Sequence, residues 1–148
     1  MASENEAPAN DAITGGCACG TVRWALSAPP LGGVYCHCTR CQRRTGTAAS
    51  PSALTVPGSL TITSGEDALK AWAPEGGWLK WFCSECGSAV YSQHPERPEV
   101  ISMRMGGFDE DPGVRPAIHQ FVAYAAPWEP LPDDGLPRFP ERAPRTRP

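Results

Sequence analysis

The chain has 148 residues, which is the size of one ordinary domain. A hydrophobic fraction of 41% is sufficient for a core, whereas 15 glycines and 17 prolines exclude a protein built from long helices. The formal net charge of −3 disfavours a polyanionic partner, so we expect no nucleic-acid binding.

The two ends of the chain are predicted to be tails around a single domain. Residues 1–13 are small, polar and acidic, and they lack the basic and apolar regions of a secretory signal. No apolar run reaches the roughly 20 residues of a membrane span, so we expect a cytoplasmic protein with no membrane partner. We predict a disordered tail over 1–13, one domain over 14–139 and a second disordered tail over 140–148.

Within the domain, hydrophobic residues mostly alternate with polar ones, which is the period of a β-strand. The first strand is expected over 21–26, and a short helix over 39–45 is ended by Gly46. Further strands are expected over 60–62, 79–81 (after a Gly76-Gly77 hairpin turn), 88–91, 100–103 and 117–124. A proline-rich strap then follows, held by the apolar side chains of Trp128, Leu131, Leu136 and Phe139. The predicted fold class is mainly β, in one domain.

Four of the seven cysteines occur in two pairs that are each followed by glycine. Cys17-Ala-Cys19-Gly and Cys83-Ser-Glu-Cys86-Gly offer two thiolates each, and the glycine permits the left-handed turn that directs backbone N–H groups at the sulfurs. Four thiolates complete a closed tetrahedral site, so we predict that these four cysteines bind a structural zinc. The alternative is that they are isolated buried thiols.

The other three cysteines, Cys36, Cys38 and Cys41, form a local group that we call the three-cysteine cluster. On a strand, Cys36 and Cys38 point to one face, and Cys41 follows after a turn, so three thiolates can meet at one point. Three protein ligands with one open position are typical of catalytic zinc. His37 alternates to the opposite face, which favours a packed or hydrogen-bonded histidine over a fourth ligand.

The cysteine count also indicates the metal. Seven cysteines cannot all pair as disulfides within the chain, and a division into four and three leaves no spare thiol. All-sulfur ligand sets suit zinc or iron–sulfur clusters, and a set of three without a fourth close ligand favours zinc. We therefore expect two zinc ions per chain.

The motifs Gly-Cys17-x-Cys19-Gly-x-Val-Arg, Cys36-His-Cys38-x-x-Cys41-x-Arg-Arg-Thr-Gly and Phe-Cys83-x-x-Cys86-Gly, in this order, resemble the glutathione-dependent formaldehyde-activating enzyme family, which includes centromere protein V. The resemblance implies a β-tent of small antiparallel sheets around zinc. It implies a structural zinc on the first and third motifs and an active-site zinc on the second. The implied activity is that of a carbon–sulfur lyase, which joins glutathione to formaldehyde.

A zinc bound by three thiolates carries a single net negative charge, which suits it to hold an incoming thiol as a thiolate rather than to produce hydroxide. We predict that the three-cysteine cluster is the catalytic site and that a glutathione-like thiol there attacks a small aldehyde. Arg43 and Arg44 can hold the carboxylates of that thiol, and Thr45 can donate to the oxyanion. Arg40, between two ligands, can offset the negative charge of the site.

Two other functions remain open on the sequence. A non-catalytic, zinc-stabilised binding module fits if a further residue closes the second zinc. A thiol redox enzyme, such as methionine sulfoxide reductase B, needs a nucleophilic cysteine outside the metal sites, so it requires a metal-free three-cysteine cluster. His119 and Tyr124 could serve as proton donors, although a histidine on a strand is more often a hydrogen-bonded structural residue.

Overall fold

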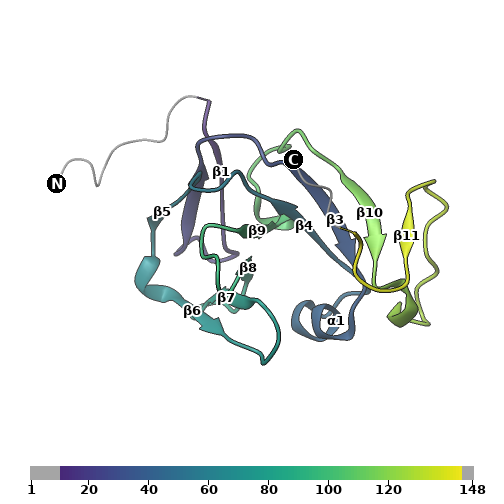
Figure 1. The fold of residues 1–148 in the computed structure, drawn as a ribbon. Helices are drawn as coiled ribbons and strands as arrows, with labels where there is room; N and C mark the ends of the chain where they lie inside the picture. Colours follow the sequence, from purple (N-terminus) through teal and green to yellow (C-terminus); the bar gives the residue numbers. More distant parts are fainter. Residues whose placement is uncertain (1–10, 145–148) are drawn as a thin grey trace.

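The computed structural model describes residues 11–144, and the parts of the two expected tails at 1–10 and 145–148 lie outside the described residues. The fold is mainly β and forms one small domain, as predicted (Figure 1). Among the described residues, no helix has the length and apolar composition needed to cross a membrane.

The strands form two sheets of unequal size. The smaller sheet is antiparallel with the order β1-β2-β5, and its strands are Ile13–Gly16, Arg23–Leu26 and Leu60–Ser64. The larger sheet has the order β11-β10-β3-β4-β9-β8-β7-β6. Its strands in chain order are Gly32–Cys36 (β3), Ser50–Leu54 (β4), Leu69–Trp72 (β6), Leu79–Cys83 (β7), Ala89–Gln93 (β8), Ile101–Arg104 (β9), Pro116–Gln120 (β10) and Arg138–Phe139 (β11). β10 pairs in parallel with β3 and β11, and the other neighbours pair antiparallel.

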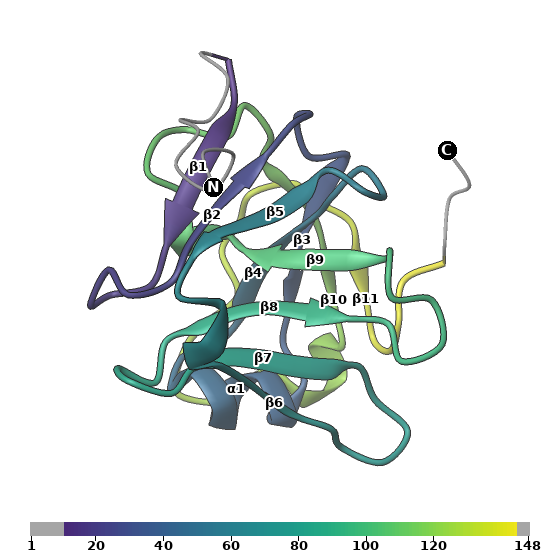
Figure 2. The same cartoon turned by 90° about the vertical axis from the view of Figure 1, so that its left-hand side faces the viewer.

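The predicted helix is confirmed as α1, Thr39–Thr45. The sulfur of Cys38 caps its first turn by accepting the N–H of Cys41, and Gly46 ends the helix with a φ of 69°. In both ribbon views α1 lies at the same end of the large sheet as β6 and β7 (Figures 1 and 2). Short 3-10 turns complete the elements at Glu66–Ala68, Met105–Gly107 and Val122–Tyr124.

The strand expected over 117–124 is wrong in its second half. β10 ends at Gln120 because Phe121 adopts a left-handed φ of 60°, and Val122–Tyr124 then forms a 3-10 turn. The rings of Phe121 and Tyr124 lie 6.3 Å apart across this turn. The alternation of apolar residues therefore reflects packing within a turn at this point and not a continuing strand.

The hydrophobic core lies between the two sheets. Its buried residues are Val22, Trp24, Leu26, Ala68, Leu69, Cys83, Val90, Tyr91 and Met103. The edge of Trp24 meets the ring of Phe108 at 5.0 Å and 88°. A Cβ atom at Gly15 would collide with the Trp24 ring, so only glycine fits where β1 crosses this side chain. The core thus joins β2 to the half of the large sheet that is formed by β9, β8, β7 and β6.

The expectation of four apolar anchors for the proline-rich strap is wrong for one of them, Trp128. Trp128 is 66% exposed and anchors nothing, whereas Leu131, Leu136 and Phe139 are half-buried. The strap is attached through the pairing of β11 with β10 and through a hydrogen bond between Asp134 and His119. Residues 140–143 are also attached, because the carbonyls of Pro140 and Glu141 accept N–H groups of the turn after β10.

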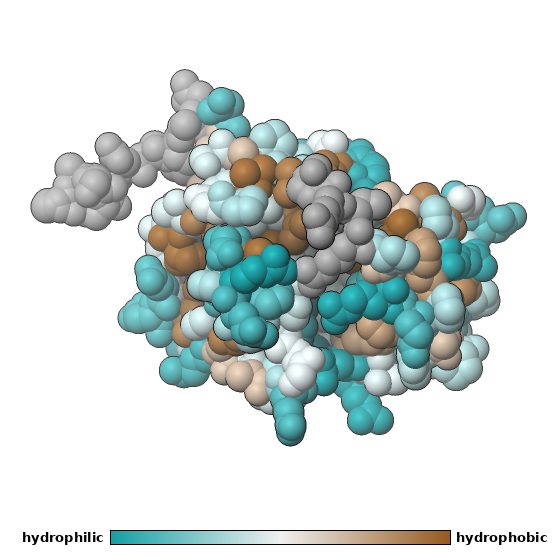
Figure 3. Space-filling view, viewed as in Figure 1, coloured by the Kyte–Doolittle hydropathy of each residue, from teal (hydrophilic) through white to brown (hydrophobic). Residues whose placement is uncertain are grey.

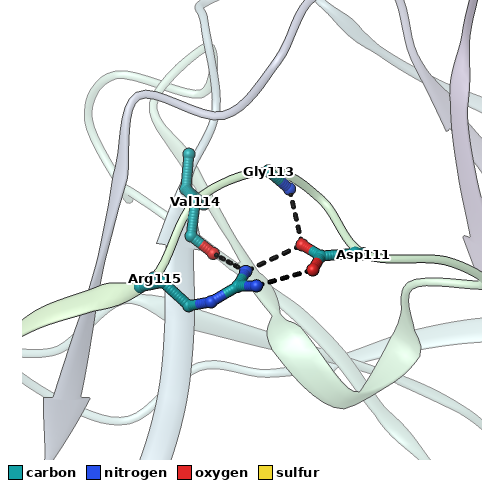
Figure 4. Close-up of polar contacts among 4 residues, drawn as sticks. All are labelled: Asp111, Gly113, Val114 and Arg115. Carbon is teal, nitrogen blue, oxygen red and sulfur yellow. Dashed lines mark hydrogen bonds and ion pairs between the residues drawn. The ribbon is translucent and has the colours of Figure 1, made fainter.

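The surface mixes hydrophilic and hydrophobic residues over the face seen in Figure 3. On the loop before β10, the guanidinium of Arg115 donates to both carboxylate oxygens of Asp111 at 2.7 and 2.6 Å, and the N–H of Gly113 donates to the same carboxylate (Figure 4). This pair holds the pKa of Asp111 well below its usual range. The positive charge of Arg115 is therefore already paired with the carboxylate of Asp111.

Candidate metal centres

The seven cysteines gather into two groups, and these have the composition that the sequence indicated. Cys17, Cys19, Cys83 and Cys86 form one group, and the three-cysteine cluster is the other. In each group the sulfur atoms all lie within 4.8 Å of one another. The described residues therefore contain two all-sulfur sites that could each hold a metal ion.

The four-cysteine group joins the two sheets. Cys17 and Cys19 lie in the loop between β1 and β2, Cys83 is the last residue of β7, and Cys86 lies in the turn between β7 and β8. The glycines that follow the pairs, Gly20 and Gly87, have φ values of 81° and 79°, as the left-handed turns require. Loops that are 64 positions apart in the chain thus meet at one point.

The sulfur atoms of this group have the spacing of a tetrahedral zinc site. The Cys17 and Cys19 sulfurs are 3.6 Å apart, and the Cys19 and Cys83 sulfurs are 3.9 Å apart. Zinc–sulfur bonds of about 2.3 Å in a tetrahedron imply sulfur–sulfur edges of about 3.8 Å. The ligand set therefore fits zinc in both chemistry and dimensions.

The surroundings of Cys83 and Cys86 shift the pKa values of these two thiols in opposite directions. Burial raises the pKa of Cys83 to about 11, whereas hydrogen bonding to Ser88 lowers the pKa of Cys86 to about 5. The N–H of Val22 also donates to the Cys17 sulfur at 3.2 Å. A metal ion bound here would have to displace the proton of the buried Cys83, which couples metal binding to pH.

The three-cysteine cluster lies where β3 passes into α1. Cys36 is the last residue of β3, Cys38 caps α1, and Cys41 lies in its first turn. The N–H of Cys41 donates to the Cys38 sulfur at 3.3 Å. Cys36 and Cys41 are buried, whereas Cys38 is half-buried and is the cysteine of the three that solvent reaches most. Cys38 is thus a helix cap and not the strand residue that the sequence suggested.

The three thiols of the cluster alter one another's pKa values through hydrogen bonds. Hydrogen bonds from Cys36 and then from Cys41 lower the pKa of Cys38 to about 2, while hydrogen bonding to Cys38 raises the pKa of Cys36. One thiolate therefore forms readily at Cys38, and its neighbours keep their protons unless a cation replaces them. This behaviour is that of a metal-ligand set.

His37 is not part of either metal site. Its Nε2 lies 2.9 Å from Nδ1 of His119, and Nε2 of His119 lies 2.8 Å from a carboxylate oxygen of Asp134. His119 is only 1% exposed, and the ring of Tyr35 stacks on it at 4.8 Å. The interpretation of both histidines as hydrogen-bonded structural residues is confirmed, and their chain of contacts ties the strap to the strand that carries Cys36.

The predicted substrate-binding residues differ in their surroundings. Arg43 is exposed on α1, whereas Arg44 is half-buried and its Nη1 is fully buried. The Thr45 hydroxyl donates to the carbonyl of Cys41 at 2.8 Å. The guanidinium of Arg40 occupies the space beside Gly77 in the β6–β7 hairpin.

Two basic residues beside the cluster were missed on the sequence. Lys80 on β7 and Arg104 on β9 come close enough for the charges of Cys38 and Cys41 to alter their ionisation. Burial lowers the pKa of both side chains. The signal available for Lys80 was its alternation with Leu79 and Trp81, which places it on the face opposite to those apolar residues.

Comparison with known proteins gives three findings. The sequence model of the family described as "Glutathione-dependent formaldehyde-activating enzyme" matches residues 12–124, a span that includes all seven cysteines. A Halomonas elongata protein named "Putative glutathione-dependent formaldehyde-activating enzyme" is 24% identical over 123 residues, which is 78% of this chain and 78% of that protein. The crystal structure of a Rhodobacter sphaeroides protein has the same fold, with a TM-score of 0.56 at 22% identity over 85% of this chain and 98% of that chain.

Proposed function

The chain belongs to the glutathione-dependent formaldehyde-activating enzyme family, and we propose that it is a zinc-dependent enzyme of the carbon–sulfur lyase type. It would add glutathione or a similar thiol reversibly to formaldehyde or another small aldehyde. The proposal includes two zinc ions per chain, one on the four-cysteine group and one on the three-cysteine cluster. The family match and the two sulfur sites support it.

The catalytic part of the proposal is carried by the incomplete ligand set of the second site. Within residues 11–144, no fourth histidine, cysteine, aspartate or glutamate joins the three-cysteine cluster. Three ligands leave a tetrahedral ion one position short, which is the arrangement of catalytic zinc. The half-buried Cys38 is the edge of the cluster from which a solvent thiol can approach.

Zinc at this site would supply a Lewis acid that favours the deprotonated form of an incoming thiol. The reaction adds the thiol across the aldehyde: a carbon–sulfur bond forms, the carbonyl π bond breaks, and the proton of the thiol ends on the carbonyl oxygen. Nothing is oxidised or reduced, so no redox cofactor is needed. The reverse reaction breaks the same bond and is the lyase step.

The protein's own residues would position this chemistry. The Cys41 N–H holds the Cys38 sulfur in place, and the buried Nη1 of Arg44 has a free donor one turn further along α1. Arg43 could reach a carboxylate from the solvent side of the helix. Thr45 could donate to the oxyanion only after releasing the Cys41 carbonyl.

Native mass spectrometry of the reduced full chain tests the proposal, with and without glutathione. We expect two zinc ions and a glutathione adduct, and no adduct with S-methylglutathione, which keeps both carboxylates but lacks the thiol. Cys38→Ser should retain the four-cysteine zinc and lose the adduct. NMR exchange between glutathione and its formaldehyde adduct should then be accelerated by the wild type and not by Cys38→Ser.

Two outcomes of these measurements would contradict the proposed function. One zinc per chain, with three alkylatable thiols at the three-cysteine cluster, would exclude the proposed mechanism. Two zinc ions without any glutathione adduct or rate acceleration would instead favour a non-catalytic zinc-stabilised module.

A further inference from the structure

One face of the large sheet is polar where it runs beside the three-cysteine cluster. Residues directly opposite each other in an antiparallel pair share a face, as do residues two apart on one strand. These rules link the following pairs across β3, β4, β9, β8 and β7: Cys36 with Ser50, Ser52 with Arg104, Ser102 with Ser92, and Ser92 with Lys80. Figure 2 shows β9, β8 and β7 lying side by side in this order. The polar face therefore runs without a break from Cys36 on β3 to Lys80 on β7.

Two cations on this face share one neutral hydroxyl. Lys80 Nζ donates to Ser92 Oγ at 3.4 Å, and Arg104 Nη2 donates to the same oxygen at 2.9 Å. Arg104 Nη1 donates to Ser52 Oγ at 2.7 Å, so the guanidinium is fixed from two sides. Arg44 approaches from α1, and its charge lowers the pKa of Lys80 further. Three positive charges thus converge, which is unfavourable unless an anion lies among them.

These cations have unused hydrogen-bonding groups. Among the described residues, the buried side-chain nitrogen and oxygen atoms without a hydrogen-bond partner are Nη1 of Arg44, Nε of Arg104 and Oγ of Ser50. Ion pairs with carboxylates in the described part of the chain involve Arg23, Arg115 and His119, and none involves the three converging cations. Buried polar groups in proteins are normally satisfied, so unpartnered donors on charged groups indicate a place for a ligand.

The thiolates of the cluster balance only part of this positive charge. Three thiolates with one divalent zinc carry a single net negative charge, and Arg44, Lys80 and Arg104 together exceed it. The surplus lies on the sheet face that also carries Cys36, and thus beside the cluster at which a substrate sulfur is proposed to bind. An anionic group on the same molecule as that sulfur would complete the charge balance.

We infer that Arg44, Lys80 and Arg104 form a carboxylate-binding site beside the three-cysteine cluster, and that this site selects thiols that carry a carboxylate. The inference rests on the proposed function, because it requires a thiol to bind at the cluster. Arg104 is the fixed cation at the bottom of the site. Arg44 on α1 and Lys80 on β7 form its sides. Lys80 and Arg104 thereby become specificity-determining residues.

Calorimetric titration of the zinc-loaded chain at pH 7 with 3-mercaptopropionate and with its neutral amide tests the inference. Both probes offer the same thiol, and they differ only in the charge of the far end. We expect the carboxylate to bind about 10- to 100-fold more tightly than the amide, as one charge-assisted hydrogen bond implies. Lys80→Met should reduce the ratio of the two affinities by about tenfold.

The chain provides a matched control in its other lysine. Lys70 lies exposed on the neighbouring strand β6, so Lys70→Met should alter neither affinity. Arg44→Met on α1 is a second test variant if Lys80→Met does not fold. Equal binding of acid and amide by the wild type would overturn the carboxylate site and leave the proposed function intact. Absence of binding by either thiol would overturn both.

Discussion

The two cysteine groups should contribute very differently to stability, and Cys83→Ser compared with Cys38→Ser measures the difference. A zinc bound by the four-cysteine group would link segments 64 positions apart, whereas one bound by the three-cysteine cluster would link residues within one strand end and one helical turn. If a shared metal acts as a cross-link, closing a loop of about 65 residues stabilises the fold by about 4 kcal/mol, and closing a loop of about five residues by about 2 kcal/mol.

These values translate into distinct melting temperatures. For a chain of this size, each kcal/mol corresponds to roughly 2–4 °C, so we expect Cys83→Ser to lower the melting temperature by about 8–16 °C and Cys38→Ser by about 4–8 °C. The first loss is large because Cys83 is fully buried and the total stability of such a domain is only about 5–15 kcal/mol. Direct coupling of zinc to folding would widen the difference.

The assay is thermal unfolding followed by circular dichroism, on zinc-loaded, reduced proteins. Wild-type protein stripped with a chelator serves as the control, because its difference from stripped Cys83→Ser measures the effect of the substitution itself on the buried core, apart from the loss of metal. Zinc content is measured on the same samples. If Cys38→Ser, retaining its four-cysteine zinc, melts as low as Cys83→Ser, the division into a structural and a catalytic site is refuted.

Two further predictions concern ionisable groups away from the metal sites. The hydrogen bond from His119 holds the pKa of Asp134 below its ordinary value, so this carboxylate stabilises the fold above about pH 3.9 and loses its effect as the pH falls through the lowered pKa. Asp134→Asn should therefore melt below the wild type at pH 7 and converge with it as the pH falls below the lowered pKa. Asp133→Asn, on the exposed neighbour, should match the wild type throughout, and a gap between Asp134→Asn and the wild type that stays constant with pH would contradict this. Burial raises the pKa of Tyr91 to about 12, so the folded state loses stability as the pH rises from about 10, the ordinary tyrosine value, towards 12. Tyr91→Phe should remove that part of the alkaline loss in denaturant titrations at pH 9 to 12, and parallel curves for the two proteins would show that Tyr91 ionises freely.

The elements that were predictable from the sequence are those specified by neighbouring residues. The end of α1 was predictable because its stop, Gly46, directly follows the helix, whereas the cap at Cys38 was not, since the sequence suggested a strand residue there. The hairpin turn at Gly76 likewise needs only its own positive φ of 70°. The end of β10 was not predictable, because Phe121 is a bulky residue in a left-handed conformation that local preference disfavours.

Strands without apolar alternation were also missed. β4 consists of Ser-Pro-Ser-Ala-Leu, and its serines face the polar side of the sheet, so its sequence resembles a loop. Pro51 is tolerated there, although β4 is an inner strand between β3 and β9. Only the pairing of distant strands reveals that Ser52 lies opposite Arg104.

The same contrast between neighbouring and distant residues applies inside the candidate site. There it separates the residues proposed to bind a thiol from those proposed to select which thiol binds. The candidate metal ligands of the three-cysteine cluster are local, since all of them lie between Cys36 and Cys41, and their spacing alone predicts where they meet. The converging cations come from α1, β7 and β9, and only the register of the large sheet brings Lys80 and Arg104 to one hydroxyl. A chain can therefore keep the sulfur motif, and with it the capacity to bind a thiol, while substitutions on two distant strands change which thiol it selects. The family motif indicates the chemistry at sulfur, and Lys80 and Arg104 are the positions at which substrate preference should be sought.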